Sequence, residues 1–303
     1  MFEQTQKNGS PAIQIGNLVV EKEPVIMGIL NVTPDSFSDG GNFNEMDRAL
    51  KHTEQMIQDG AAIIDIGGES TRPGYTLVSS QEEIERTAPI IEAIKKRFDV
   101  PVSLDTYKAV VAEAGICAGA DLINDIWGLK LSPKLMKEHP EFAKENAPEE
   151  GFPEYANAKM AKLVCEKEVP ICVMHNRDCT EYQDYLPDVI ADLKQCIEIA
   201  HLAGIKDSKI ITDPGVGFGK DLQQNLKIIQ CVDELKKLGY PILLGTSRKS
   251  VIGLALDVAK DERMAGTVAT TVMGVERGCK IFRVHDVKEN YQAMRMAMEI
   301  LKA

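Results

Sequence analysis

The chain has 303 residues, of which 44% are hydrophobic and 27% are charged. This length fits one large domain or two ordinary ones, and the apolar share is typical of a globular protein with a sizeable core. The formal net charge is -11 at pH 7. Because proteins that bind polyanions are usually basic, nucleic acid is not expected as a main partner.

Two further features bound the class of protein. The longest apolar runs fall short of the roughly 18 residues that cross a bilayer, and the first ten residues are polar. We therefore expect no membrane span, no export and a cytoplasmic location. The seven cysteines contain no C-x-x-C pair, so we expect reduced packing residues rather than a disulfide framework or a structural zinc site.

The first predicted element is a small hairpin over Ile13–Val20, which turns at Gly16-Asn17. We assign residues 1–24 to this hairpin segment, which could plug the bottom of the fold, and residues 25–303 to a single domain. Eight short apolar segments then follow, as is typical of parallel strands that are buried on both faces. They are 25–32, 62–67, 102–105, 122–126, 171–175, 209–213, 242–245 and 280–284.

Helical periodicity is found between these segments and after the last one. The predicted helices cover 47–59, 80–98, 107–118, 188–203, 222–238, 263–277 and 287–302. In the second helix Ser80 is the expected N-cap, because Glu83 follows three residues later as in a capping box. The connection Leu131–Val169 is unusually long. We interpret it as a surface insertion with some helix, and a lid or a partner contact is the alternative.

Eight alternations of strand and helix predict an α/β fold, a (β/α)8 TIM barrel with a short N-terminal β-hairpin. A doubly wound open sheet is the main alternative. The barrel is favoured because polar residues follow nearly every predicted strand, and only a barrel brings all eight strand ends to one face.

Several of these strand ends carry acids or amides. Asp105, Asn124 and Asp213 can together bind a flat heterocycle with a mixed donor and acceptor edge, such as an aminopyrimidinone. A single acid after a strand is equally well explained as a helix N-cap. Three such residues at equivalent positions favour a binding role.

The last two strands carry cations. Lys249 follows the seventh strand, and alternation along the eighth turns Arg283 and His285 to the same side. Late strands of TIM barrels often bind phosphate, so these three residues predict an anion site. After the second strand, Arg72 offers a planar fork to a carboxylate or a phosphate, with a solvated surface arginine as the alternative.

No His/Cys pattern predicts a tightly held transition metal. Asn31 and the acids of the loop after the first strand suit a hard cation such as Mg2+, bound together with a phosphate. The role of His175 stays open between contact with a ligand and bracing of neighbouring loops.

Seven segments, taken together, resemble those of dihydropteroate synthases, a family of pterin-binding enzymes. They occur in the order found in that family and span most of the chain. They are Asn31–Gly40, Asp65–Gly74, Ser103–Lys108, Asn124-Asp125, Asp213–Lys220, Gly245–Ser250 and Arg283–Asp286.

The resemblance implies an enzyme that joins 4-aminobenzoate to (7,8-dihydropterin-6-yl)methyl diphosphate, giving 7,8-dihydropteroate and pyrophosphate in folate synthesis. It also implies Mg2+ as cofactor, a protein of the kind that sulfonamides target, and a homodimer formed through late helices. The implied pterin-binding residues are Asp105, Asn124, Met174, Asp213, Phe218, Gly245 and Lys249. Those implied for the diphosphate are Asn31, Arg283 and His285, with Asn31 also binding the metal. Those implied for 4-aminobenzoate are Thr71, Arg72, Pro73 and Ser250. The implied catalytic residues are Asp39, Asp105, Lys249, Arg283 and His285.

Two alternatives belong to other functional classes. A pterin-binding methyltransferase module would present methyltetrahydrofolate to a corrinoid protein, and it needs neither the Asn31–Gly40 loop nor a diphosphate site. A catalytically silent paralogue would serve only as an interaction partner. Intact acids and cations at the strand ends favour the synthase over both. The insertion at 131–169 is longer than expected for a compact member of the family.

Overall fold

The structure is a computed structural model that describes residues 11–32, 42–69, 77–146 and 148–303. Two short strands open the described chain, β1 (Ile13–Ile15) and β2 (Leu18–Val20), and they pair antiparallel. The turn between them passes through Gly16 with φ +55°, a left-handed conformation that glycine adopts without strain. The predicted hairpin is confirmed.

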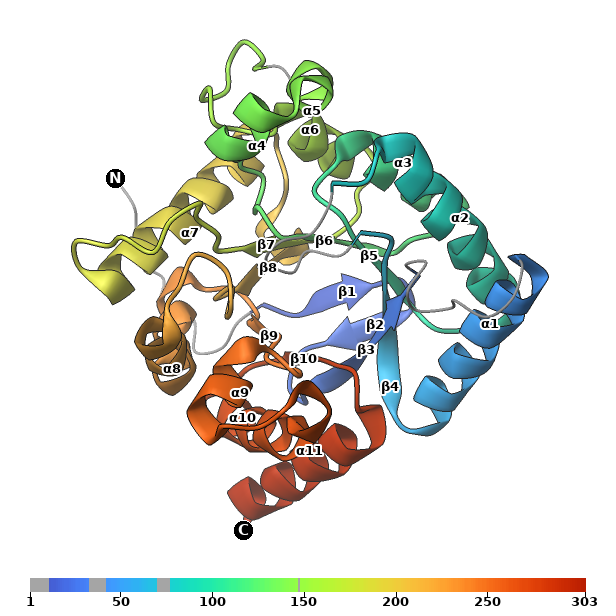
Figure 1. Cartoon of the computed structure of the whole chain (residues 1–303), viewed down its shortest axis with the longest axis vertical. Coiled ribbons are helices and arrows are strands. Elements are labelled where there is room, and N and C mark those ends of the chain that lie inside the picture. The colour runs from blue at the N-terminus through green and yellow to red at the C-terminus, as the bar shows by residue number, and fades with distance from the viewer. Residues whose placement is uncertain (1–10, 33–41, 70–76, 147) are drawn as a thin grey trace.

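Eight parallel strands form the centre of the molecule (Figure 1). They are β3 (Val25–Asn31), β4 (Ala61–Gly67), β5 (Val102–Asp105), β6 (Leu122–Asp125), β7 (Ile171–Met174), β8 (Ile210–Asp213), β9 (Leu243–Leu244) and β10 (Ile281–Val284). Hydrogen-bonded neighbours run in the order β8-β7-β6-β5-β4-β3-β10-β9. The ring closes between its two outer strands, where Thr212 N donates to Pro241 O at 2.9 Å. The predicted TIM barrel is confirmed, and the open-sheet alternative is wrong.

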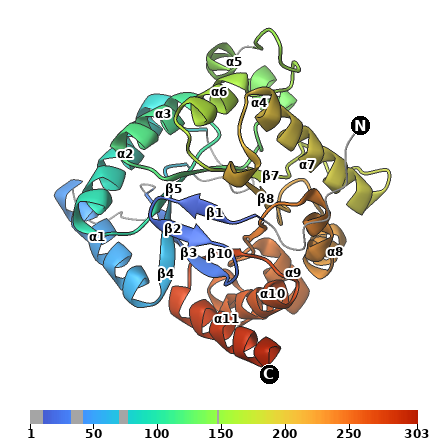
Figure 2. The ribbon, with the colours of Figure 1, turned by 180° about the vertical axis from the view of Figure 1, so that it is seen from behind.

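Helices surround the strands on all sides in both face-on views (Figures 1 and 2). They are α1 (Asn42–Gln58), α2 (Ser80–Arg97), α3 (Ala109–Ala118), α4 (Pro133–Glu138), α5 (Pro140–Glu145), α6 (Ala158–Glu166), α7 (Tyr185–Leu202), α8 (Leu222–Gln230), α9 (Ser250–Leu256), α10 (Met264–Glu276) and α11 (Val287–Lys302). Within the described ranges the 3-10 segments are η2 (Asp207–Lys209), η3 (Val232–Leu238) and η4 (Lys260–Glu262). Among the described residues, no helix combines the length and apolar character of a membrane span.

Two details of the predicted helices are wrong. The N-cap of α2 is Ser79, whose side chain accepts from Glu82 N at 3.2 Å, while the Ser80 hydroxyl donates to Glu145 of α5. The helix predicted over 222–238 ends at Gln230 and continues as η3. The buried residues of η3, Val232 and Leu235, lie three apart, which is the spacing of a 3-10 turn.

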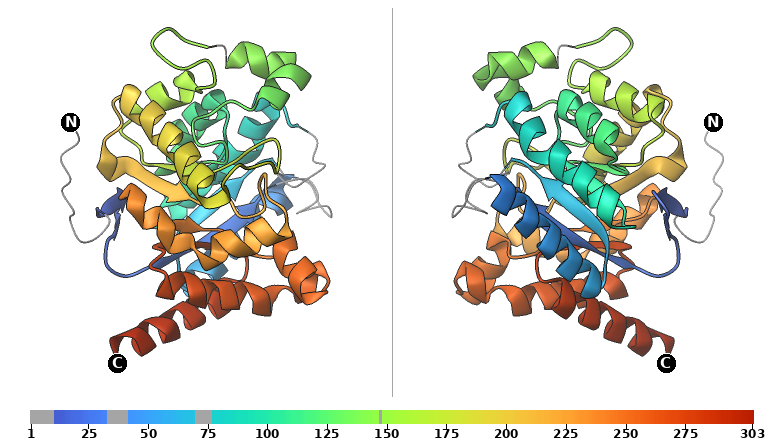
Figure 3. Two further views of the ribbon diagram at one scale, coloured as in Figure 1. Left: turned by 90° about the vertical axis from the view of Figure 1, so that its left-hand side faces the viewer. Right: turned by 90° about the vertical axis from the view of Figure 1, so that its right-hand side faces the viewer.

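The hairpin fills one end of the barrel, as expected. Its residues Ile13, Ile15 and Val20 are buried in one apolar cluster with side chains from seven strands. Those side chains are Met27, Ile63, Leu122, Cys172, Ile211, Leu243 and Ile281. They come from the first half of each strand, so the hairpin closes the amino-terminal end and the carboxyl-terminal end is left to hold a site (Figure 3).

The insertion contains the short helices α4, α5 and α6, and it lies on the far side of the ring from α11 (Figures 1 and 3). Leu135 and Phe142 from this insertion are buried against Tyr107, Ile126 and Met174 at the carboxyl-terminal end of the barrel. The insertion therefore packs on the outer wall of the barrel mouth, where it supports residues that neighbour the predicted site.

Candidate functional site

The centre of the barrel mouth is a guanidinium group held between two acids. Arg283 Nε donates to Asp65 Oδ2 at 2.6 Å, and Nη2 donates to Asp105 Oδ2 at 2.6 Å. These residues come from β10, β4 and β5, so the arginine crosses the barrel interior. Asp105 and Arg283, which are both predicted site residues, are brought together. Asp65, which is fully buried, was not among the predicted site residues.

A second group of predicted residues lies beside the first. A Cβ built on Gly245 would lie 3.8 Å from Arg283 Cβ and 3.9 Å from Asp213 Oδ2. Lys249 Nζ donates to Val216 O at 2.5 Å and stands 4.7 Å from the centre of the Phe218 ring. The missing side chain at Gly245 therefore leaves room next to the carboxylate of Asp213 and the side chain of Arg283.

The amides and the methionine complete this rim. A Cβ built on Gly67 would lie 3.8 Å from Asp105 Oδ2 and 3.9 Å from Asn31 Oδ1, so both side chains face the space at Gly67. Asn124 is buried and stands in register with Asp105 on the adjacent strand. Met174, also buried, stands in register with Asp213.

His285 and Ser250 lie at the edge of the group. Ser247 Oγ accepts from the backbone N–H of His285 at 3.0 Å, and it lies 3.0 Å from His285 Nδ1. Which atom donates in this side-chain bond depends on the ring nitrogen of His285 that carries the proton. Ser250 is exposed at the start of α9, directly after Lys249. The other predicted residues, Asp39, Thr71, Arg72 and Pro73, lie outside the described residues.

Burial tunes the charges at this site. It raises the pKa of Asp105 to about 7, against the opposing effect of Arg283 and with a further rise from Asp65. Burial lowers the pKa of Lys249 to about 8, although Asp213 opposes the shift. Groups that titrate near neutrality in a polar cluster are typical of functional sites.

His175 braces loops, which decides between the two roles that the sequence leaves open. Its ring is fully buried, with Nε2 lying 3.0 Å from Asp192 Oδ2 and Nδ1 accepting from Lys220 Nζ at 2.7 Å. Burial lowers its pKa to about 3, so the imidazole is neutral. Lys220 Nζ also donates to Gly215 O and Phe218 O, both at 2.9 Å. Lys220 was not among the predicted site residues, and it fixes the loop that carries Phe218.

Comparison with known proteins identifies the fold and the family. The family model for pterin binding enzymes matches residues 27–285. A dihydropteroate synthase from Clostridium beijerinckii is 53% identical over 297 residues, which cover 98% of this chain and 99% of the relative. The chain belongs to the dihydropteroate synthase family of pterin-binding enzymes.

Solved structures of this family superpose closely on the chain. A dihydropteroate synthase from Clostridium difficile, crystallised in the presence of pteroic acid, matches with a TM-score of 0.82 and 47% identity, covering 94% of this chain and 99% of its own. The Xanthomonas albilineans dihydropteroate synthase with 4-aminobenzoic acid matches with a TM-score of 0.83 and 34% identity. The match covers 97% of this chain and 99% of that structure's chain. The sequence-based assignment to this family is confirmed.

Proposed function

We propose that the protein is a dihydropteroate synthase, which transfers a pterinylmethyl group from its diphosphate to the amine of 4-aminobenzoate. The observation that carries this proposal is the convergence of Asp105, Asp213, Lys249 and Arg283 at one mouth of the barrel. Membership of the family supports it. The methyltransferase module is not favoured, because the reported relatives are synthases.

The acids and amides of the rim suit the edge of a pterin ring. A carboxylate such as Asp213 accepts hydrogen bonds from the amino group and a neighbouring ring N–H, while the Asn124 amide both donates and accepts. Lys249 Nζ, placed over Phe218, can donate to the ring carbonyl. Phe218 and Met174 supply apolar faces for a flat ring, and Gly245 leaves the space that the ring needs.

The cationic side of the site suits the leaving group. The bond between the pterin methylene carbon and the diphosphate oxygen breaks, and its electron pair leaves with pyrophosphate. Arg283 and His285 stabilise the negative charge that develops there. The amine nitrogen of 4-aminobenzoate forms the new bond to the methylene carbon and then loses a proton. Stabilisation of the intermediate carbocation by Asp39 stays a prediction.

The donor set at Asn31 fits Mg2+. Among the described residues there is no group of three or more His, Cys, Asp and Glu side chains that would hold a metal alone. A carboxamide oxygen at the mouth of the barrel is instead the kind of partial site that Mg2+ uses when a diphosphate supplies further oxygens. We propose that Asn31 binds Mg2+ together with the diphosphate. When bound, the ion would add positive charge that favours departure of pyrophosphate.

The proposal also covers the second substrate. We propose that 4-aminobenzoate is bound by Thr71, Arg72, Pro73 and Ser250, and that sulfonamides compete for the same place.

We also propose that the protein forms a homodimer. Its support is a set of exposed apolar side chains on α9, α10 and α11 that a second copy could cover. They are Leu254, Leu256, Met264, Val272, Met273, Met296, Ile300 and Leu301. Light scattering during size exclusion would measure the mass of the assembly.

The cytoplasmic location stays a prediction.

The proposed reaction is tested by mixing protein, Mg2+, the pterin diphosphate and 4-aminobenzoate. We expect pyrophosphate and dihydropteroate to appear in equal amounts, and Lys249→Ala to lose most turnover while keeping its circular dichroism spectrum. A parallel assay supplies methyltetrahydrofolate and a corrinoid acceptor. Methyl transfer in this parallel assay, together with no dihydropteroate in the first, would favour the methyltransferase module over the synthase.

A further inference from the structure

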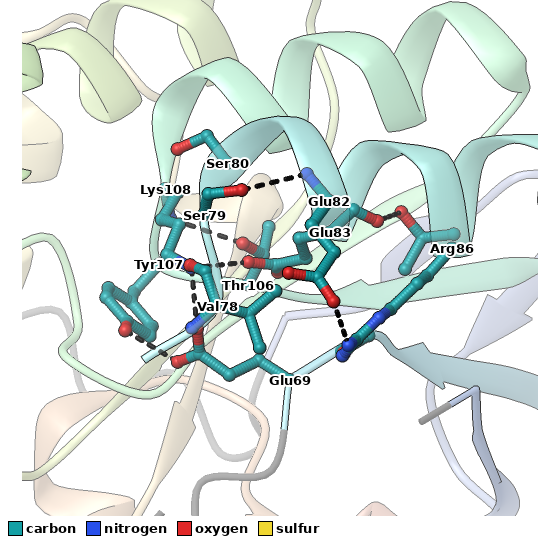
Figure 4. Close-up of polar contacts among 12 residues, drawn as sticks. Glu69, Val78, Ser79, Ser80, Glu82, Glu83, Arg86, Thr106, Tyr107 and Lys108 are labelled. Atoms are coloured by element: carbon teal, nitrogen blue, oxygen red, sulfur yellow. Dashed lines mark hydrogen bonds and ion pairs between the residues drawn. The ribbon is translucent and has the colours of Figure 1, made fainter. Parts of the chain in front are cut away.

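A buried ionic cluster lies behind the rim and includes none of the residues used above. Its centre is Lys108, which is 2% exposed and directly precedes α3. Lys108 Nζ donates to Glu69 Oε2 at 2.6 Å and to Glu83 Oε2 at 2.8 Å (Figure 4). A third bond, of 2.6 Å, goes to the carbonyl oxygen of Val78. One ammonium group is therefore surrounded by two carboxylates and a backbone oxygen.

This cluster ties together the two ends of the connection between β4 and α2. Glu69 stands two residues after the end of β4, and Val78 stands two residues before the start of α2. Val78 N donates to Glu69 Oε2 at 2.9 Å, and Lys108 binds both residues. The distance between the ends of the connection is thus set by two side chains. The connection itself contains Arg72 and its neighbours, to which the proposed function assigns 4-aminobenzoate.

The same cluster is linked to the wall of the pterin site. Glu69 Oε1 accepts from the hydroxyl of Tyr107 at 2.7 Å, as Figure 4 shows. Tyr107 is buried in the apolar cluster that contains Met174, and Leu77, at the far end of the connection, packs against that cluster. Both ends of the connection are therefore held relative to the place proposed for the pterin ring.

Stability alone is a poor reason for such an arrangement. Taking charges out of water is costly, and apolar side chains of similar volume usually stabilise a fold at least as well as a buried ion pair. Burial alone would lower the pKa of Lys108, but Glu83 and Glu69 raise it, so the lysine is charged. What charge-assisted bonds supply is direction, because short bonds to fixed carboxylate oxygens set the relative positions of the segments that carry them.

We propose that Glu69 and Lys108 are positioning residues for 4-aminobenzoate, holding the two ends of the β4–α2 connection at the separation that amine binding requires. The inference rests on the proposed function. Neither residue touches the reacting atoms. Their loss therefore raises the KM for 4-aminobenzoate and leaves the pterin side of the site intact.

Glu83 offers a matched control. It binds the same lysine at a similar distance and is equally buried, but it belongs to α2 and makes no bond to Val78 among the described contacts. We expect Glu69→Ala to raise the KM for 4-aminobenzoate about tenfold, with the KM for the pterin diphosphate within about twofold of wild type. Glu83→Ala should leave both KM values within about twofold of wild type. It should lower the melting temperature by about as much as Glu69→Ala does. Glu69→Gln, which keeps an acceptor oxygen for Val78 N, should recover most of the affinity.

The outcomes separate the two proposals. If wild-type protein shows no synthase turnover, the proposed function fails. If wild type turns over but Glu69→Ala keeps a normal KM for 4-aminobenzoate, or raises both KM values equally, the positioning role is wrong. It is also wrong if Glu83→Ala raises the KM for 4-aminobenzoate as much as Glu69→Ala does. If Glu69→Ala does not fold, the comparison uses Glu69→Gln and Glu83→Gln. A KM for 4-aminobenzoate that rises about threefold in Glu69→Gln alone, with the KM for the pterin diphosphate unchanged, supports the role. Equal changes in Glu69→Gln and Glu83→Gln overturn it.

Discussion

Replacing Asp65 by Asn removes one negative charge from the centre of the site and nearly preserves its shape. Asp65 Oδ2 accepts from Arg283 Nε at 2.6 Å, and Oδ1 has no partner among the described residues. Arg283 keeps its second acid, Asp105, through Nη2. The substitution should therefore loosen the orientation of the guanidinium without leaving it as an unpaired buried charge.

The size of the effect follows from these contacts. A hydrogen bond to a charged group contributes about 1.5–3 kcal/mol, and Asn keeps a neutral acceptor that recovers part of this. Since about 1.4 kcal/mol corresponds to a factor of ten, we expect kcat/KM for the pterin diphosphate to fall about tenfold. Asp65→Ala, which keeps no acceptor, should lose about a hundredfold.

A second effect appears in the pH dependence. Burial raises the pKa of Asp105 to about 7, and the charge of Asp65 contributes to the rise. Neutralising Asp65 should lower that pKa, which would move the acid limb of kcat/KM toward lower pH by about one unit. The folded-state pKa lies above the unfolded value of about 3.9, so Asp105 costs stability as pH rises from about 4 to 7. Asp65→Asn should lessen this loss.

Pyrophosphate release measured from pH 5.5 to 9 gives the rate and the pH profile together, and thermal unfolding over the same range gives the stability. Asp233→Asn is the control, because it breaks a surface ion pair of 3.0 Å with Arg277 and should leave the kinetics unchanged. Wild-type kcat/KM and an unmoved acid limb in Asp65→Asn would refute the assigned role of the Arg283 pair.

Three other predictions test single features of the site. Burial lowers the pKa of Lys249 to about 8, so activity should fall as pH rises through 8, and Lys249→Arg should lose that alkaline limb because arginine stays protonated; an unchanged limb would contradict the assignment. Gly245→Ala places a methyl group 3.9 Å from Asp213 Oδ2, so pyrophosphate-release kinetics should show a KM for the pterin diphosphate raised about tenfold at an unchanged melting temperature; an unaltered KM would place the ring elsewhere. Gly215→Ala puts a Cβ 1.8 Å from His175 O, at a residue whose φ is +66°. Urea unfolding should show a free energy of unfolding reduced by at least ~1–3 kcal/mol, and a wild-type midpoint would contradict this.

Most of the barrel could be predicted because its strands are buried on both faces. An apolar run such as Val102–Asp105 has no other simple reading between two helical stretches, and its observed bounds match the prediction. The short helices were not predicted as separate elements. The seven residues of α9 make fewer than two complete turns, so their pattern does not separate a helix from a loop. Two helices of the insertion, α4 and α5, have six residues each, and the same reasoning applies to them.

The strand-end residues could be predicted because topology alone brings them together. Asp105, Asp213 and Arg283 need only lie near the carboxyl ends of strands in one closed barrel to share one mouth, even though their strands are not neighbours. Asp65 was missed because its importance depends on a partner on another strand, Arg283. A signal was nevertheless present, since an acid inside the apolar strand Ala61–Gly67 must find a cation or lose its charge.

Two buried lysines, Lys108 and Lys220, each hold a different part of the proposed site. The order of the motifs along the sequence does not reveal this arrangement. Lys220 binds Gly215 O and Phe218 O, and thereby fixes the loop proposed to face the pterin ring. Lys108 binds Glu69 and Val78, and thereby fixes the ends of the connection proposed to bind 4-aminobenzoate. Because the two clusters share no hydrogen bond among the described contacts, a change at one should alter the KM of one substrate more than that of the other. Two substrates that must meet at one carbon atom would then be positioned by two different hydrogen-bonded clusters.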